Sequence, residues 1–389
     1  MKILIAHNSY QHQGGEDAVV EAEVALLRQH GHEVEVYRRH NDELQHMSHA
    51  SAAMSAIWSR QSASEGESVC KRVQPDVIHA HNTFPLISPS LYWMAERRRI
   101  PVVQTLHNFR FVCPQAMFLR DGKTCEDCLG KVPWRAVAHK CYRESAVQSA
   151  VSVGMLTAHR AIGTYRDRIT RFIALNNFCR AKFIAGGLPA DRISVKPNFF
   201  DSTVAPQWSE RSGGLFAGRL SFEKGLDVLS GAAKKLDACG VKVVGRGPLE
   251  HEVRQVFQNN FLGFQPQPKV VELLGKALYL VAPSTCYENF PLVVVEAFAS
   301  GTPVIASRHG SLAELVTDGV TGLLFTPGDP DDLATRIAWA NAHPEEMKIM
   351  GQAARAEYEN KYTPEQNYRI LTGIYAEAML GKYGDKRAA

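Results

Sequence analysis

The sequence predicts an α/β protein of two domains, each a parallel sheet wrapped on both faces by helices. At 389 residues, the chain is too long for one ordinary hydrophobic core. Short apolar runs alternate with segments of helical periodicity along most of its length. The alternation breaks once, in the polar stretch 200–214, which carries Pro206 and ends in Gly213-Gly214. Such a stretch is typical of a linker between two domains.

The first half of the chain predicts strands separated by helices. Residues 2–6 form an apolar run, and 16–30 follow with apolar side chains at helical spacing, among them Val19 and Val24. Gly31 closes this helix, because glycine is favoured just past a helix end. Further strands are expected at 33–37, 76–80, 101–106, 172–175 and 193–196.

The same alternation restarts after the linker and then becomes helical. Strands are expected at 214–217, 241–244, 277–282, 303–306 and 322–325, and helices at 292–300, 332–342, 345–360 and 364–380. Two such halves predict Rossmann-like domains whose parallel sheets face each other across a cleft, because open α/β sheets bind ligands at the carboxyl ends of their strands. We expect domains at 1–199 and 200–363, and a closing helical segment at 364–389.

Composition argues against several classes of protein. No run of about 18 apolar residues occurs, so we expect no membrane-spanning helix. The apolar start turns polar at His7 and Asn8, unlike a signal peptide. The net charge of +4 is too small to indicate nucleic-acid binding. Eight cysteines without a signal peptide favour a soluble protein of the reducing cytoplasm.

The most specific motif lies at 288–297. Glu288 and Glu296 flank a loop-to-helix transition, and Pro291 suits the first helical position. The amides of residues 290–293 are expected to be unpaired donors at a helix N-terminus, which binds anions. A carboxylate in so apolar a helix is costly without a partner, which favours a ligand over the alternative of two surface glutamates.

Two further segments of the second half join a strand to a glycine turn. Arg219 and Lys224 follow the strand at 214–217, where a guanidinium and an ammonium can neutralise a diphosphate leaving group. Two exposed cations without a role are the alternative. Gly245 and Gly247 follow the next strand and let the backbone approach a ligand closely. No GxGxxG or GxxxxGK[ST] pattern occurs, which argues against dinucleotide oxidation and P-loop chemistry.

The order of these motifs resembles a known family. GRL and EKG within 218–225, VGRGPL at 244–249, and PS, E-x7-E and GTPV within 283–304 are together similar to the GT-B glycosyltransferases of family 4. The resemblance covers essentially the whole chain. It implies a retaining transferase of the EC 2.4 class that uses a nucleoside-diphosphate sugar and needs no metal. It also implies that the last helix crosses back onto the first domain.

The resemblance assigns expected roles to single residues. Arg219 and Lys224 would contact the donor diphosphate, Glu288 the sugar hydroxyls, and Glu296 the ribose. Residues expected in catalysis are His107, Arg219, Lys224 and Glu288. Residues expected to bind the donor are Gly14, Gly15, Gly218, Arg219, Lys224, Gly245, Gly247, Asn289, Phe290, Pro291, Leu292, Val293 and Glu296.

Two features of the first half fit the same family. Gly14-Gly15 lies between the first strand and the first helix, where amides can face a phosphate, and a plain turn is the alternative. His107 follows the strand at 101–106, and a histidine at this point contacts the transferred sugar in the resembled family.

The neighbours of His107 are interpreted differently. His79 and His81 are expected to sit in or beside a strand with their hydrogen bonds satisfied. Asn82 and Thr83 are expected to line the acceptor side.

A cysteine cluster and a basic segment complete the first half. An insertion at 113–141 contains Cys113, Cys125, Cys128 and Cys141. Four thiolates can close a structural zinc site; unligated thiols, a disulfide or an iron–sulfur cluster are the alternatives.

The arginines of the basic segment form either a solvated face or a patch that docks on anionic membrane. They are Arg160, Arg166, Arg168 and Arg171, with 97–99 upstream.

The sequence therefore favours a cytoplasmic glycosyltransferase, peripheral on the inner face of the membrane, that acts on a glycan or lipid-linked acceptor in bacterial surface-polysaccharide or glycolipid assembly. Two alternatives are a nucleotide-sugar epimerase of the same fold and an inactive partner subunit that binds a sugar nucleotide. The GGE loop at 14–16, His107 and the E-x7-E pattern together argue against the epimerase. The intact cations and glutamates, Arg219, Lys224, Glu288 and Glu296, argue against the inactive subunit.

Overall fold

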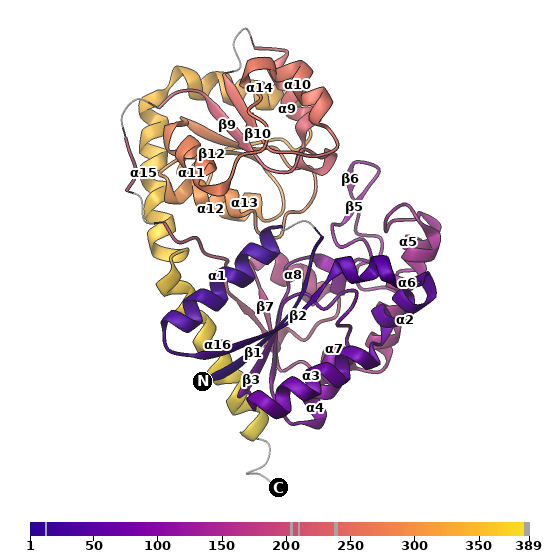
Figure 1. The fold of residues 1–389 in the computed structure, drawn as a ribbon. Helices are drawn as coiled ribbons and strands as arrows, with labels where there is room; N and C mark the ends of the chain where they lie inside the picture. The colour runs from indigo at the N-terminus through magenta and orange to yellow at the C-terminus, as the bar shows by residue number, and fades with distance from the viewer. Residues whose placement is uncertain (12–13, 203–204, 209–210, 237–239, 385–389) are drawn as a thin grey trace. The chain divides into compact units, whose positions relative to one another are not determined.

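Short apolar runs of the chain form two parallel sheets, one in each of two units (Figure 1). The structure is a computed structural model that describes residues 1–11, 14–202, 205–208, 211–236 and 240–384. The first unit comprises Met1–Phe118, Glu126–Pro197 and Asn367–Ala389, and the second comprises Leu119–Cys125 and Asn198–Gln366. Parts of the expected linker (203–204, 209–210) and of the expected closing segment (385–389) lie outside the described residues.

The first unit contains a six-stranded sheet in the order β2-β1-β3-β4-β7-β8. Its strands are β1 (Lys2–Ser9), β2 (Glu33–His40), β3 (Val77–Ala80), β4 (Val102–Thr105), β7 (Arg171–Ala174) and β8 (Ile193–Val195). All neighbouring strands are parallel; Ile5 pairs with Val36 on one side and with His79 on the other. Continuous apolar strands suit such a sheet because both of its faces are covered.

Four helices of the first unit begin at a polar N-cap side chain. Ser48, Ser59, Ser145 and Asn176 each accept a hydrogen bond from a first-turn amide, which fixes the start of α2, α3, α6 and α8. The helices are α1 (Gly15–Gln29), α2 (His49–Ile57), α3 (Arg60–Val73), α4 (Ser90–Arg97), α5 (Arg135–Ala138), α6 (Ala146–Ala161), α7 (Thr164–Asp167), α8 (Asn177–Ala185) and α16 (Pro364–Gly384), with short turns η1 (Asn41–His46), η2 (Phe109–Phe111) and η3 (Ala190–Arg192).

The core of the first unit includes the last helix of the chain. Val24 of α1 and Leu371 and Tyr375 of α16 pack in one cluster with Ile3 and Ile5 of β1. Because these side chains are buried, α16 is an integral part of the first unit's hydrophobic core.

The second unit contains a five-stranded parallel sheet in the order β10-β9-β11-β12-β13. Its strands are β9 (Gly214–Ala217), β10 (Val241–Val244), β11 (Tyr279–Ala282), β12 (Val304–Ser307) and β13 (Gly322–Phe325). Its helices are α9 (Leu226–Ala233), α10 (Glu250–Phe257), α11 (Gln267–Lys276), α12 (Leu292–Ala299), α13 (Leu312–Leu315), α14 (Pro330–Ala342) and α15 (Pro344–Lys361), with turns η4 (Phe222–Lys224) and η5 (Gln258–Asn260). The predicted α/β class is confirmed.

A small hairpin, β5 (Leu119–Arg120) with β6 (Lys123–Thr124), groups with the second unit, whereas the sequence-based boundary assigned all of 113–141 to the first domain. Gly122 explains the grouping: a Cβ there would lie 2.8 Å from the ring of Phe222, so the turn packs directly on η4. None of the described helices combines the length and the apolar character needed to cross a bilayer.

In both sheets the strand order reverses once. The reversal falls between β1 and β3 in the first sheet and between β9 and β11 in the second. Loops leave such a switch point in opposite directions, and the crevice at the carboxyl ends of its strands is where doubly wound sheets bind ligands. The loops after these four strands are therefore where a site is expected.

Candidate active site

Lys224 and Glu288 form an ion pair at the switch point of the second sheet. Nζ of Lys224 lies 2.6 Å from Oε1 of Glu288, and the Ser284 hydroxyl donates to the same oxygen at 2.6 Å. Lys224 ends η4, the turn after β9, while Ser284 and Glu288 belong to the loop after β11. The sequence indicates Ser284 only as part of the PS motif; its position just after the buried strand β11 is the signal that marks it.

The electrostatics of this pair favour two charged groups. Burial acts against each charge, lowering the pKa of the Lys224 ammonium and raising the pKa of the Glu288 carboxyl. Their mutual attraction outweighs burial, so the pKa of Lys224 is raised and the pKa of Glu288 is lowered. The side chains are 29% and 13% exposed, so a ligand can reach the charged pair.

Two glycines bring the loops of the second sheet together. Gly225 has a φ of 69°, and a Cβ there would lie 1.9 Å from the carbonyl oxygen of Pro283. A Cβ on Gly245 would lie 1.9 Å from the carbonyl oxygen of Gly218. Only glycine permits these approaches. The predicted glycine turns at Gly218 and Gly245 therefore lie side by side, and Gly247 continues the second of them.

Arg219 is placed differently from its expected partner. It follows Gly218 in the same turn, and its side chain is exposed. The described residues give its guanidinium no hydrogen bond or ion pair. The structure thus joins Lys224 to Glu288 and leaves Arg219 outside that pair, and its contact with a diphosphate stays a prediction.

The N-terminus of α12 offers fewer donors than expected. The helix begins after Pro291, which caps it without a side-chain hydrogen bond. Proline has no N–H, so within 290–293 only Phe290, Leu292 and Val293 carry amides. As first-turn residues, Leu292 and Val293 have no intrahelical acceptor. Two amides aligned with the helix dipole therefore remain for an anion.

Glu296 lies in α12 with 7% of its surface exposed. One of its oxygens accepts a hydrogen bond from Nε2 of Gln267 at 2.8 Å. Burial raises the pKa of this carboxyl, and the Gln267 bond offsets the effect only in part. A buried carboxylate with this single hydrogen bond destabilises the unliganded protein, as expected for a group whose function is to bind a ligand.

In the first unit, the glycine loop is tied to an aspartate. Gly14 caps α1, and its amide donates to Oδ2 of Asp17 at 2.9 Å. Oδ1 of Asp17 lies 2.8 Å from Nε2 of the buried His7. The Gly14 amide is therefore not available to a phosphate, while Gly15 is exposed at the first helical position. His7 and Asp17 were not identified as a pair from the sequence.

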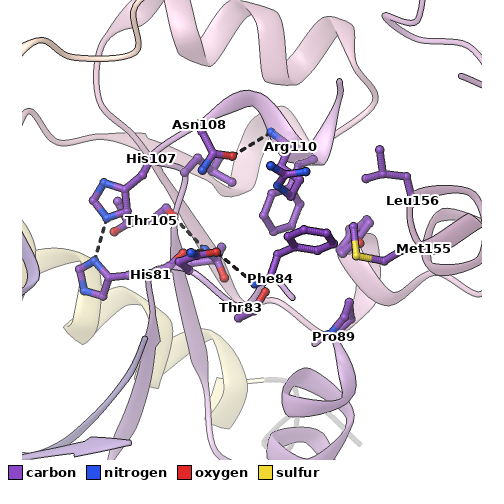
Figure 2. Close-up of a pocket in the computed structure, with 15 residues that line it drawn as sticks. His81, Thr83, Phe84, Pro89, Thr105, His107, Asn108, Arg110, Met155 and Leu156 are labelled. Atoms are coloured by element: carbon purple, nitrogen blue, oxygen red, sulfur yellow. Dashed lines mark hydrogen bonds between the residues drawn. The ribbon is translucent and has the colours of Figure 1, made fainter. Parts of the chain in front are cut away.

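His107 lies over His81 at the carboxyl ends of β4 and β3 (Figure 2). Nε2 of His107 is 2.9 Å from Nδ1 of His81. Burial lowers the pKa of His107 to about 3, so its imidazole is neutral. Beside it lies a cavity of about 30 Å³, room for a water, which is also lined by Asn82 and Thr83.

Asn82 and Thr83 line this cavity but are already engaged. Nδ2 of Asn82 donates to the carbonyl oxygen of Asn8 at 2.9 Å, and the Thr83 hydroxyl lies 3.3 Å from that of Tyr92. Their expected contact with an acceptor stays a prediction.

Arg110 closes the other side of the cavity. Its guanidinium lies over the ring of Phe84, 4.3 Å from the centroid (Figure 2). It also lies over the ring of Tyr142, 4.9 Å from that centroid. This cation was not singled out from the sequence.

A buried charged pair, Lys196 and Glu23, lies beside His81. Nζ of Lys196 is 2.5 Å from Oε1 of Glu23, and neither side chain has exposed surface. His79 is satisfied as expected: Nδ1 meets the Tyr375 hydroxyl and Nε2 the Thr105 hydroxyl, both at 2.7 Å. The signal for this cluster was present in the sequence, because Glu23 lies on the apolar face of α1.

The structure does not assemble the expected zinc site. Within the described residues, the only group of three or more metal-type ligands lying within 4.8 Å of one another contains no cysteine. The insertion is anchored by an ion pair instead, with Nζ of Lys182 2.6 Å from Oε1 of Glu126. Zinc at Cys113, Cys125, Cys128 and Cys141 therefore has no support in this arrangement.

The four arginines of the basic segment do not form one solvated patch. Nη2 of Arg160 donates to the carbonyl oxygen of Phe111 at 2.8 Å. Arg168 stacks on Trp93, 4.4 Å from the ring centroid. Arg166 and Arg171 form ion pairs with Asp167 and Glu377.

Comparison with known proteins places the chain in a family. The model of glycosyltransferase family 4 matches residues 13–204, and the model of glycosyl transferases group 1 matches residues 210–357. A crystal structure of Anabaena HepE in complex with UDP superposes with a TM-score of 0.66 at 20% identity, covering 97% of this chain and 100% of that one. The chain belongs to glycosyltransferase family 4 and has the GT-B fold.

Two curated relatives share part of the sequence. A sulfoquinovosyl transferase of Arabidopsis thaliana is 27% identical over 301 residues, which cover 74% of this chain and 54% of the relative. An amylovoran biosynthesis glycosyltransferase of Erwinia amylovora is 27% identical over 223 residues, which cover 52% and 55%. The chain thus spans a little over half the length of these relatives.

Proposed function

We propose that the chain is a retaining glycosyltransferase that moves a sugar from a nucleoside-diphosphate sugar to a hydroxyl acceptor without a bound metal. The observation that carries this proposal is the Lys224–Glu288 pair at the switch point of the second sheet. An ammonium suits a diphosphate, and a carboxylate suits sugar hydroxyls. A nucleoside-diphosphate sugar carries its diphosphate and its sugar hydroxyls next to each other, so one donor molecule can contact both side chains.

The chemistry asks mainly for charge stabilisation. The bond from the sugar C1 to the diphosphate breaks, and the acceptor oxygen bonds to C1 from the same face. The acceptor proton passes to the departing phosphate, so no side chain needs to form a covalent intermediate. Lys224 and the two amides of α12 stabilise the charge that develops on the diphosphate, with Arg219 moving in from the exposed turn. Glu296 binds the ribose.

The acceptor is proposed to be a glycan or a lipid-linked sugar of a bacterial surface polysaccharide or glycolipid. The relative named for amylovoran biosynthesis and the sulfoquinovosyl transferase support this class, and the UDP bound to HepE supports a nucleoside-diphosphate donor. His107 is proposed to contact the transferred sugar.

Peripheral contact with anionic membrane, at the cytoplasmic face, is also part of the proposal. We assign this contact to the segment from Lys131 to Val147 instead of to the arginines of the basic segment. The segment from Lys131 to Val147 exposes Val132 and Trp134 at 62% each and Val147 at 74%, and it carries Lys131 and Arg135. Apolar side chains beside cations bind anionic lipid surfaces. Flotation of the chain with anionic but not with zwitterionic vesicles is expected, and weaker flotation of Trp134→Ala; equal recovery in all cases contradicts this contact.

The test of the function is transfer by the purified chain. Nucleotide sugars are screened for thermal stabilisation, since a ligand of the folded state raises Tm. Stabilising donors are then offered with hydroxyl acceptors, and nucleotide release, product mass and the anomeric configuration are measured with and without EDTA. Retained configuration and an EDTA-resistant rate are expected. Epimerised donor without transfer, or binding without turnover, contradicts the proposal in favour of an epimerase or an inactive subunit.

A further inference from the structure

His81 lies between His107 and the buried carboxylate of Glu23. Its Nδ1 is 2.9 Å from Nε2 of His107, and its Nε2 faces Oε2 of Glu23 at 3.6 Å. Within the described structure, neither Nε2 of His81 nor Oε2 of Glu23 has a hydrogen-bond partner. His81 is 3% exposed and Glu23 has no exposed surface, so neighbouring protein groups, and not bulk water, set the position of the protons on these side chains.

A metal ion is one reading of this cluster, because Glu23, His79 and His81 offer ligand atoms within 4.8 Å of one another. Two contacts argue against it. The Lys196 ammonium already sits 2.5 Å from Glu23 and would repel a cation. Both nitrogens of His79 are bonded to hydroxyls and would have to give up one of these bonds.

The carboxylate instead determines which nitrogen of His81 carries the proton. Burial lowers the pKa of His81 well below the ordinary value, so the ring is neutral and has a single N–H. An anionic oxygen 3.6 Å from Nε2 favours a proton on that nitrogen over a lone pair. Nδ1 of His81 is then an acceptor.

The tautomer of His81 in turn determines the tautomer of His107. Because Nδ1 of His81 accepts, Nε2 of His107 must donate the 2.9 Å hydrogen bond. His107 is also neutral, so its Nδ1 carries a lone pair. No group in the described part of the chain bonds to this Nδ1, and His107 lines the cavity.

We propose that His81, oriented by Glu23, is a positioning residue that fixes His107 in the Nε2–H tautomer. This inference rests on the proposed function, in which His107 contacts the transferred sugar. His107 then accepts a hydrogen bond from a sugar hydroxyl and cannot donate one. At the contacted position the site selects a hydroxyl and disfavours a carboxylate, whose oxygens would meet a lone pair.

The first test is spectroscopic and needs no transfer activity. The full chain is labelled with ¹⁵N-histidine, and the His107 signals are assigned by their loss in His107→Gln. A protonated Nε2 and a bare Nδ1 are expected. The opposite tautomer, or rapid averaging of the two, overturns the proposal. Because this readout is independent of turnover, a wild-type chain that transfers no sugar refutes the proposed function but not the tautomer.

The second test compares substitutions of His81. His81→Asn places an amide oxygen near the lost Nδ1, so it keeps the acceptor, and the His107 tautomer is expected to persist with kcat within about threefold. His81→Leu removes the acceptor; mixed tautomers and a fall in kcat of about tenfold are expected, with the donor KM unchanged. His79→Gln is the matched control, since His79 is also buried and lies in β3, two residues before His81, but its hydrogen bonds go to Tyr375 and Thr105 and not to His107. An unchanged His107 spectrum in folded His81→Leu, or equal kcat losses in the Asn and Leu variants, overturns the proposal.

Discussion

The ammonium of Lys196 meets the carboxylate of Glu23 at 2.5 Å in the core of the first unit, although the two residues are 173 positions apart in the chain. Lys196 follows β8, an edge strand of the sheet, and Glu23 lies in α1, so the pair joins that edge to the first helix of the unit. A fully buried pair offsets its large desolvation cost only while both partners are present.

Removing one partner is therefore expected to be worse than removing both. Lys196→Met should lower the free energy of unfolding by about 3–5 kcal/mol, because it leaves a buried unpaired carboxylate. The double variant with Glu23→Leu should recover most of this loss. Urea denaturation of the two single variants and the double variant measures the coupling. Additive effects of the two substitutions would show that the pair is not coupled.

Lys224→Ala should lower kcat by about 100-fold, because the charge on the departing diphosphate loses its nearest cation. Arg219→Ala tests the same role for the exposed arginine. The matched control is Lys242→Ala, an exposed lysine on β10, which should leave kcat unchanged. Steady-state kinetics with the identified donor provide the measurement. Near wild-type turnover in both the Lys224 and the Arg219 variants would refute their role.

The Lys224–Glu288 pair also predicts how stability depends on pH. Lys224 and Ser284 hold the pKa of Glu288 below 4.5, so the pair stabilises fully above that value, and its contribution is lost as pH falls through the lowered pKa. The Tm difference between wild type and Glu288→Gln should be constant from pH 5 to 8 and shrink below about pH 4. A difference that instead grows on acidification contradicts a charged pair.

The contribution of Glu296 to stability is expected to change with pH in the opposite direction to that of Glu288. Burial raises its pKa above 4.5, so ionisation destabilises the fold increasingly as pH rises from that value toward the raised pKa. Glu296→Gln should therefore raise Tm, more at pH 8 than at pH 4, while weakening binding of the nucleoside diphosphate. Calorimetric unfolding and titration with the nucleotide check both halves. A lower Tm with unchanged nucleotide affinity would assign Glu296 a structural role.

Tyr375→Phe should cost about 1–3 kcal/mol, because it leaves Nδ1 of His79 buried without its 2.7 Å partner. Tyr368→Phe on the same helix is the control: its hydroxyl bonds to the partly exposed His32, so its loss should cost less than about 0.5 kcal/mol. Thermal unfolding of both variants gives the comparison, and equal losses would contradict the buried bond.

Much of the fold was predictable from local pattern. Strands such as 214–217 and 241–244 coincide with the observed β9 and β10, since buried parallel strands are continuous apolar runs bounded by polar or glycine residues. Helices α2, α3 and α6 were not identified, because their apolar stripes are diluted by alanine and serine and their stability comes from tertiary packing.

The candidate site was predictable only in part. Parallel sheets expose side chains at their carboxyl ends, so the positions of His107, Lys224 and Glu288 could be inferred from the strands before them. Which groups pair is decided by long-range packing: the partner of Lys224 is 64 residues away. The same holds for His81, which was expected to be satisfied, yet its Nε2 has no hydrogen-bond partner in the described structure.

The place of α16 has a practical consequence for dissecting the protein. A fragment that stops at residue 197 would lack Leu371 and Tyr375, and it would expose the face of β1 that carries Ile3 and Ile5. Such a fragment should aggregate when expressed by itself. Supplied separately, a peptide of Pro364–Gly384 should rescue it, which makes the two pieces a split pair whose reassembly reports on folding of the first unit alone.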